Sequence, residues 1–501
     1  MVSLKQKTVS GVLWTGVAKM SMQGILFGVT IILARLLSAD AFGIISIAAI
    51  VGMAVTMVND RGLGTAIVQR ISLKDSYLSS VFWGGIVFGI LIFFLFYLAS
   101  FPMAYFFKRA IIQKVVSVMA CGFVIGALGI VQKSLLTKAM DFKKLAIIEM
   151  IAVLVSAIAA VVLALIGAGV WSLVALMLGR DIMTIPLLWI FCPWKPGLHF
   201  SWREFKELFR FSAQVLGNDV ATYVISNTDI TIIGRILGVT LLGYYSWAMY
   251  MIKIPITRLS GIVSKVVFPA FSSLQADLVK FKKGFLKATT MISIITFPLL
   301  AGIGLFSKEI ILLFVGEKWM PAQLPLVLLV PMGMLKSVGT IKGSVLMACG
   351  RPDIELKWNI FYFVVLLGAV FLGTRFGLTG VAAAFTILYL LTFPVIQTIT
   401  NRQVRVSGRE YVDALIPAAT AVLIMSVLVA GFRILSASLH LSSLWILILG
   451  GLLAIGSYFL VLILFFSPVL QEFVKIVRKP KTKMVMNQEK SNTLKNGPES
   501  I

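Results

Sequence analysis

Long apolar stretches dominate this chain and leave little room for anything else. Runs of about twenty apolar residues, the length that crosses a membrane as a helix, follow one another with only short polar or Gly/Pro breaks between them. Of the 501 residues, 59% are hydrophobic and 13% are charged. That is more apolar surface than the core of a soluble domain can bury. The sequence therefore predicts an all-α integral membrane protein.

The breaks between the apolar runs divide the chain into about fourteen transmembrane helices. Gly167-Ala168-Gly169 and Phe376-Gly377 are typical of tight turns between antiparallel helices. The sixth helix is predicted to end before Pro196-Gly197, because proline and glycine stop helices. The expected spans are 10–36, 42–68, 79–101, 112–134, 145–166, 169–191, 208–236, 241–270, 285–306, 322–347, 355–373, 377–400, 411–434 and 442–466.

Lysine and arginine residues are concentrated in every second loop between these spans. The N-terminal segment and loops such as 133–144 and 280–287 hold most of them, and the intervening loops hold few. The positive-inside rule therefore places both termini in the cytoplasm, and an even number of spans requires the same. We attribute the net charge of +25 to this topology. No zinc-finger, RNA-binding or helix-turn-helix pattern accompanies the charge, so no nucleic-acid partner is expected.

The chain resembles a duplicated unit. Ile32–Leu37 with Gly43, Ser46 and Ala48 aligns without a gap, at an offset of 200, with Ile232–Leu237 followed by Gly243, Ser246 and Ala248. Gly169-Val170 similarly matches Gly380-Val381. Both matches place each span on the span six further along, which predicts parallel repeats related by an axis along the membrane normal. We expect six-helix lobes at 1–200 and 201–400 facing a central cavity, two further helices at 401–470, and a polar cytoplasmic tail at 471–501.

Several basic residues fall inside the predicted spans, where a charged group costs at least about 2.5 kcal/mol. They are tolerated where they face a wet cavity lined by protein, and a cationic cavity favours an anionic passenger. Arginine in particular matches phosphate with its two-pronged fork. Pairing with acids and reaching out to water at a helix end are the alternatives for each residue. The candidate substrate-binding residues are Arg61, Arg180, Lys253, Arg258, Lys336 and Lys342.

Acidic residues in the spans are candidates for coupling transport to protons or sodium. These are Asp60, Asp219 and Asp229; Asp229 lies beside Asn227 and Thr228, which supply further oxygen atoms, although a lysine partner is the alternative. No nucleotide-binding loop or zinc-protease motif occurs. The three cysteines lie singly, which suggests neither a disulfide framework nor a metal site. We expect no enzyme activity and no cofactor.

A set of short motifs extends over most of the chain: LKQKTVSGVLW at 4–14, LARLLS at 33–38 with Phe42-Gly43, AIVQ at 66–69, MDFKKL at 140–145, GVWSLV at 169–174, LGYY at 242–245, FPA at 268–270 and ACGRPD at 348–353. In combination these motifs resemble those of Wzx-type polysaccharide flippases of the WzxC branch, and within that branch those of the teichuronic-acid exporters. The resemblance implies the fold of the multidrug/oligosaccharidyl-lipid/polysaccharide (MOP) exporter superfamily, in a bacterial cell membrane. It also implies a substrate of undecaprenyl pyrophosphate that carries an oligosaccharide repeat unit, with membrane lipids, a polysaccharide polymerase and glycosyltransferases as partners.

The hypothesis is thus a flippase that works by alternating access, with cations such as Arg61, Lys253 and Arg258 meeting the phosphates. Two alternatives stay open. A multidrug or organic-ion antiporter of the same fold needs acidic residues to attract cationic drugs, whereas the inner charges here are mainly basic. A non-transporting membrane subunit of a glycan-assembly complex is the other alternative.

Overall fold

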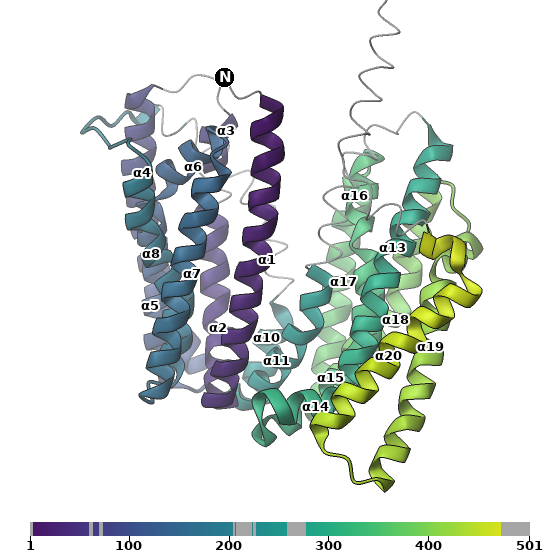
Figure 1. Cartoon of the computed structure of the whole chain (residues 1–501). Coiled ribbons are helices and arrows are strands. Elements are labelled where there is room, and N and C mark those ends of the chain that lie inside the picture. The colour runs from purple at the N-terminus through teal and green to yellow at the C-terminus, as the bar shows by residue number, and fades with distance from the viewer. Residues whose placement is uncertain are drawn as a thin grey trace, which may run out of the picture. The chain divides into compact units, whose positions relative to one another are not determined.

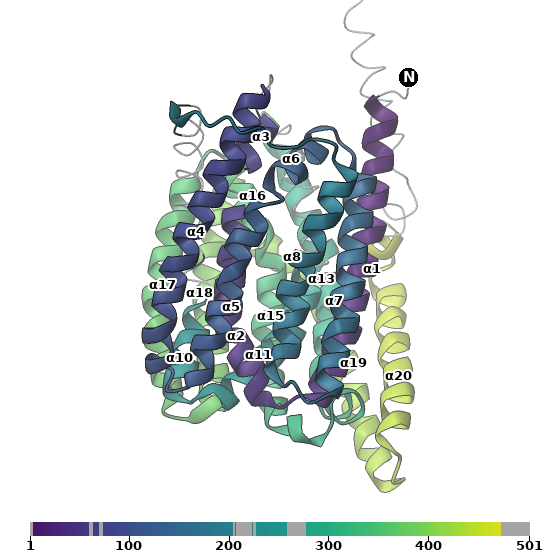
Figure 2. The ribbon, with the colours of Figure 1, turned by 90° about the vertical axis from the view of Figure 1, so that its left-hand side faces the viewer.

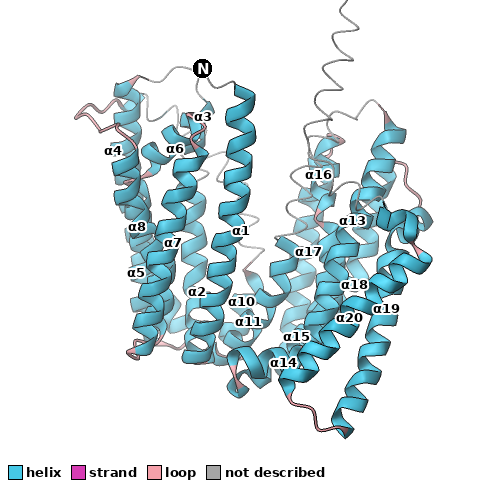
Figure 3. Ribbon diagram, viewed as in Figure 1, coloured by secondary structure: helices cyan, strands magenta, loops and turns pink. Residues whose placement is uncertain are grey.

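The computed structural model describes residues 4–59, 64–69, 74–203, 206, 223, 227–257 and 277–471. Within these ranges every regular element is a helix, which confirms the all-α prediction (Figure 3). Twelve helices of the described part are long and apolar enough to cross a membrane. The predicted spans 42–68, 208–236 and 241–270 lie partly outside the described residues, and the tail beyond residue 471 lies wholly outside them.

The chain packs into two compact units that interleave along the sequence. The first comprises residues 1–251, 310–329 and 356–389, and the second comprises 252–309, 330–355 and 390–501. The division at residues 200 and 400 expected from the repeat remains a prediction.

The first unit begins with a bundle of antiparallel helices (Figures 1 and 2). These are α1 (Leu4–Leu36), α2 (Ala39–Thr56), α3 (Gly64–Gln69), α4 (Asp75–Phe106), α5 (Ala110–Ala127), α6 (Ile130–Lys138), α7 (Phe142–Leu165) and α8 (Val170–Phe191). α7 packs along α8 and α1, α4 along α5, and α2 along α5 and α8. The predicted turn before α8 is confirmed: Gly167 and Gly169 have φ of +81° and +58°, in the region that favours glycine.

The same unit includes elements from later in the chain. They are α10 (Thr228–Ile236), α11 (Val239–Pro255) up to residue 251, the 3₁₀ helix Glu317–Ala322, the start of α15 (Gln323–Gly339), most of α17 (Pro352–Thr374) and the first half of α18 (Gly377–Gln403).

The second unit is built around α13 (Leu278–Leu305). It also holds α14 (Ser307–Ile310) up to residue 309, the end of α15, α16 (Ile341–Ala348), the rest of α18, α19 (Gly408–Ser438) and α20 (Ser443–Phe465). α19 packs on both α13 and α20. Tyr458 of α20 donates a 2.8 Å hydrogen bond to the carbonyl of Ile294, and Thr290 of α13 donates one of 2.9 Å to the carbonyl of Ala414. The last two long helices are therefore an integral part of this unit.

Two of the expected continuous spans are broken into two helices. The span predicted at 112–134 is divided between α5 and α6 at Gly129, and the span at 322–347 is divided between α15 and α16 at Thr340. These are the fourth and tenth predicted spans, which the repeat pairs with each other. The local cause at the first break is Gly129, whose missing side chain leaves room for Ile185 and Leu188 of α8.

Candidate functional site: a polar cavity among the N-terminal helices

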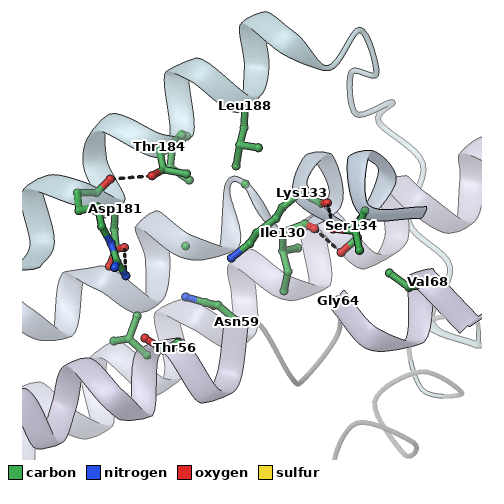
Figure 4. A pocket seen from close by; sticks show the side chains of 16 residues that line it. Thr56, Asn59, Gly64, Val68, Ile130, Lys133, Ser134, Asp181, Thr184 and Leu188 are labelled. Atoms are coloured by element: carbon green, nitrogen blue, oxygen red, sulfur yellow. Dashed lines mark hydrogen bonds and ion pairs between the residues drawn. The ribbon is translucent and has the colours of Figure 1, made fainter. Parts of the chain in front are cut away.

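A cavity of about 430 Å³ lies inside the first unit, between α2, α3, the break from α5 to α6, and α8 (Figure 4). Its volume is in the range that holds small ligands or the polar part of a larger one. Apolar side chains such as Val55, Ile130 and Leu188 form part of the wall. The polar lining residues among those described are Thr56, Asn59, Lys133, Ser134, Thr137, Arg180, Asp181 and Thr184.

The break at Gly129 directs the polar face of α6 into this cavity. Lys133, Ser134 and Thr137 follow one another at the spacing that puts side chains on one face of a helix. Ser134 donates to the carbonyl of Ile130 at 2.7 Å, and Thr137 donates to the carbonyl of Lys133 at 2.8 Å. Because each hydroxyl proton is taken up by the helix itself, the hydroxyl oxygens keep acceptor capacity toward the cavity. Lys133 extends its ammonium group into the same space (Figure 4).

α8 supplies the opposite wall. The Nη2 atom of Arg180 lies 3.7 Å from Oδ1 of Asp181, which is close enough for an ion pair but too long for a hydrogen bond. The two side chains are 46% and 35% exposed. Thr184 donates a 2.8 Å hydrogen bond to the carbonyl of Arg180. The guanidinium of Arg180 is thus partly neutralised while its donor fork is left for a ligand.

The position of the Asn59 side chain, three residues after the end of α2, depends on a glycine of α5. Its Nδ2 atom lies 3.4 Å from the carbonyl oxygen of Gly122. A Cβ atom on Gly126 would lie 1.8 Å from the same Nδ2, so that only glycine at position 126 lets Asn59 take this place. The amide supplies both donors and an acceptor at the cavity wall.

The charge of the cavity favours an anion. Lys133 and Arg180 contribute two positive charges and Asp181 one negative charge among the described lining residues. The arginine fork can bind two oxygens of one phosphate or carboxylate, and the lysine acts as a point charge. Hydroxyl and amide groups around them can bind the hydroxyls of a sugar. The site can therefore bind and orient a polar, anionic ligand.

Of the predicted binding residues that the structure describes, one lines this cavity and three lie in the second unit. Arg180 lines the cavity. Lys253 is exposed near the end of α11, and Lys336 and Lys342 are half-buried on α15 and α16. Lys342 interacts electrostatically with Glu355. These three lysines belong to the second unit and do not line this cavity. The remaining predicted site residues, Arg61, Arg258, Asp60 and Asp219, lie outside the described residues.

Asp229 of α10 is 6% exposed and is held by hydrogen bonds. The Tyr245 hydroxyl donates to Oδ2 at 2.9 Å, and the backbone N–H of Ile230 donates to Oδ1 at 2.9 Å. Tyr245 itself is 1% exposed, and Tyr362 of α17 is close enough to interact electrostatically with Asp229. In the part of the chain that the structure describes, no lysine or arginine pairs with Asp229.

Lys133 lines the cavity but was not among the predicted site residues; the sequence analysis assigned it to a cytoplasmic loop at the end of the predicted span 112–134. Two signals were available. Gly126 and Gly129 mark a weak point in the span, and Lys133, Ser134 and Thr137 form a polar helical face just after it. Asn59 carried no comparable signal, because its position in the cavity depends on a contact with α5.

The matching family model and two similar proteins are all named for the biosynthesis of a polysaccharide, teichuronic acid or lipopolysaccharide. The model of a family described as "Polysaccharide biosynthesis protein" matches residues 32–324. The chain is 30% identical to the teichuronic acid biosynthesis protein TuaB of Bacillus subtilis, over 78% of this chain and 82% of that protein. It is 28% identical to the lipopolysaccharide biosynthesis protein WzxC of Escherichia coli, over 78% and 80% of the two chains.

Among solved structures, the fold is similar to that of the lipid II flippase MurJ in an inward closed conformation. The TM-score is 0.71, with 92% of this chain and all of that chain covered at 14% identity. This likeness concerns the fold alone. The matches to the family model and to TuaB, which cover more than half of the sequence, show that the chain belongs to the polysaccharide biosynthesis protein family.

Proposed function

We propose that this protein is a flippase that moves undecaprenyl-pyrophosphate-linked oligosaccharide repeat units across the bacterial cell membrane for the synthesis of a surface polysaccharide. The observation that carries the proposal is the cavity that contains Lys133 and Arg180 within a bundle of membrane-spanning helices. Two cations inside such a bundle are costly unless acidic partners, water or an anionic ligand face them, and Asp181 neutralises only one of the two charges among the described lining residues. Family membership supports a role in polysaccharide synthesis.

The geometry suggests how such a substrate is held. The pyrophosphate lies against the ammonium of Lys133 and the fork of Arg180, and the first sugar lies against the hydroxyls of α6 and the amide of Asn59. The polyprenyl chain stays in the lipid, where its burial has no cost. With both termini in the cytoplasm, the end of the first unit that carries α3 and α6 faces the cytoplasm, where the lipid-linked precursor is assembled. A glycan with acidic sugars, as the name of TuaB suggests for that protein, matches the same cations.

We further propose that Asp229 takes part in ion coupling, together with Asp60 and Asp219. A buried carboxylate bonded to a tyrosine hydroxyl, with no basic partner among the described residues, has the chemistry to bind and release a proton or a monovalent cation. Lys253, Lys336 and Lys342 are proposed as further cationic contacts in the second half of the chain.

A matched pair of double variants tests the cavity. Lys133→Ala/Arg180→Ala removes two positive charges from the cavity, and Lys114→Ala/Arg375→Ala removes two from exposed positions elsewhere in the same unit. In proteoliposomes loaded with a fluorescent lipid-linked oligosaccharide, the fraction that becomes accessible to an added glycosidase measures flipping. We expect the cavity variant to flip at least tenfold more slowly than wild type and the control to flip at the wild-type rate. Equal rates for both variants, with equal amounts of folded protein, contradict the proposal.

A further inference from the structure

Within the first unit, the starts of α2 and α11 meet at positions that the repeat makes equivalent. Thr240 Oγ1 donates a 3.1 Å hydrogen bond to Oδ1 of Asp40, and the two residues are separated by 200 positions. The first residues of the two helices, Ala39 and Val239, have the same separation. Equivalent residues of two parallel repeats can contact each other only on their symmetry axis, so this crossing marks the axis at that end of the helices.

The crossing is too close for any side chain. A Cβ atom on Gly43 would lie 1.8 Å from the carbonyl oxygen of Val239, and a Cβ atom on Gly243 would lie 1.9 Å from the carbonyl oxygen of Ala39. Each glycine therefore packs on the first residue of the other helix, and the contact is reciprocal. Paired glycines of this kind let two helices approach backbone to backbone. We call these four residues, together with Asp40 and Thr240, the seam.

Trp319 closes the seam from one side. Its indole N–H donates a 2.7 Å hydrogen bond to the carbonyl of Ala34, in the last turn of α1, and the side chain is fully buried. The ring stands edge-on to Phe42 of α2, with centroids 5.1 Å apart, and lies against Trp247 of α11, with centroids 5.7 Å apart. Lys318 donates to the carbonyl of Arg35 at 2.8 Å. The 3₁₀ helix Glu317–Ala322 thus caps α1 and contacts both repeats.

The contacts at the seam can be broken at a small cost in free energy. Asp40 also accepts a 2.9 Å hydrogen bond from Arg109, and the two side chains are 33% and 50% exposed, so water reaches this end of the bundle. Hydrogen bonds at such a place can be exchanged for bonds to water at a small net cost. At Gly43 and Gly243 the nearest atoms of the other helix are backbone carbonyl oxygens. The cavity lies at the other end of the unit: its α3 and α6 are near the start of α1, and the seam is at the end of α1, about 50 Å along that helix (Figure 1).

We propose that the seam is the closed outer gate of the transporter and that Trp319 is its latch; this rests on the proposed flippase function. With the cavity facing the cytoplasm, the seam seals the opposite end. Release of the head group requires α2 and α11 to part at the two glycines, while the indole of Trp319 leaves the carbonyl of Ala34.

A reversible cross-link tests whether the seam must open. Cys121, Cys192 and Cys349 are replaced by alanine, and Asp40→Cys/Thr240→Cys places two thiols across the seam. Oxidation is expected to reduce flipping at least tenfold, and a reductant is expected to restore it. Ser100→Cys/Ser117→Cys is the matched control, because these hydroxyls lie 3.1 Å apart between α4 and α5 within one repeat. Oxidised control protein should flip normally. Unchanged flipping with the seam cross-linked shows a fixed crossing and overturns the proposal.

A second measurement does not depend on the substrate. Ala39→Cys, at a position 7% exposed, is labelled with a membrane-impermeant maleimide added from outside. Trp319→Ala should raise the labelling rate about tenfold, and Trp319→Phe, which keeps a ring but loses the bond to Ala34, should raise it less. Trp445→Ala, at a residue 53% exposed, is the control. If both Trp319 variants are labelled as slowly as the control, the latch is refuted. If labelling rises but no variant flips the lipid-linked glycan, the gate stands and the proposed substrate is wrong.

Discussion

Arg433 of α19 donates a 2.7 Å hydrogen bond to Oε1 of Glu309, at the end of α14. The carboxylate is buried, with a side chain 4% exposed, and the arginine also donates to the carbonyl of Leu305. Within the described part of the chain, Oε2 of Glu309 has no hydrogen-bond partner. One arginine therefore provides the ion pair of a buried carboxylate and fastens the helix added beyond residue 400 to the end of α13.

Arg433→Ala should destabilise the protein by about 3 kcal/mol, because it leaves a buried carboxylate without its cation. The midpoint of thermal unfolding in detergent measures the loss. Arg433→Ala/Glu309→Gln should recover part of it, since the buried charge is then gone. Arg375→Ala, at an exposed turn, is the control. A control that unfolds as early as Arg433→Ala rules out this explanation.

Gly126→Ala should impair flipping, because the added methyl group displaces Asn59 into the cavity. A decrease of about tenfold in the flipping rate is expected without loss of folded protein. Asn59→Ala removes the clashing amide together with its proposed contact to the sugar, so Gly126→Ala/Asn59→Ala should flip at the rate of Asn59→Ala alone. Gly28→Ala, where no atom lies within 4 Å of the new Cβ, should have no effect. A double variant that flips more slowly than Asn59→Ala alone argues against displacement of Asn59 as the cause.

Arg180→Lys should show how much substrate binding depends on the positive charge at position 180 and how much on the shape of the guanidinium group. Lysine keeps the positive charge but not the fork that binds two phosphate oxygens. We expect the substrate concentration at half-maximal flipping to rise a few-fold in Arg180→Lys and more than tenfold in Arg180→Ala, measured over a series of lipid-linked glycan concentrations. Identical values for the two variants indicate that the fork is not used.

Tyr245→Phe should destabilise the first unit by about 1–3 kcal/mol, because Asp229 loses a donor while it stays buried. Tyr105→Phe, at a side chain 88% exposed, is the control for the thermal unfolding midpoint.

Asp229→Asn is expected to fold but to lose the acceleration of flipping by an imposed ion gradient, if Asp229 couples transport to that ion. Undiminished acceleration in Asp229→Asn removes Asp229 from the coupling role.

The helical spans could be predicted because their signal is local. Twenty consecutive apolar residues form a helix in lipid whatever their neighbours are, since every backbone polar group must be bonded within its own segment. The turn at Gly167 and Gly169 was equally readable, because positive φ favours glycine. The breaks at Gly129 and Thr340 were missed, since hydropathy continues through them. At Gly129 the space taken by α8 side chains is a tertiary feature.

The sequence by itself determined that this chain is a helical membrane protein, its motifs pointed to its family, and its internal similarity predicted two related halves. Those properties follow from residue type and spacing along the chain. Only the tertiary structure decided that Lys133 and Arg180 line one cavity, and that Gly43 and Gly243 pack on the backbones of Val239 and Ala39. Such contacts join residues far apart in sequence, and they depend on how helices pack, which the period of a single helix does not specify.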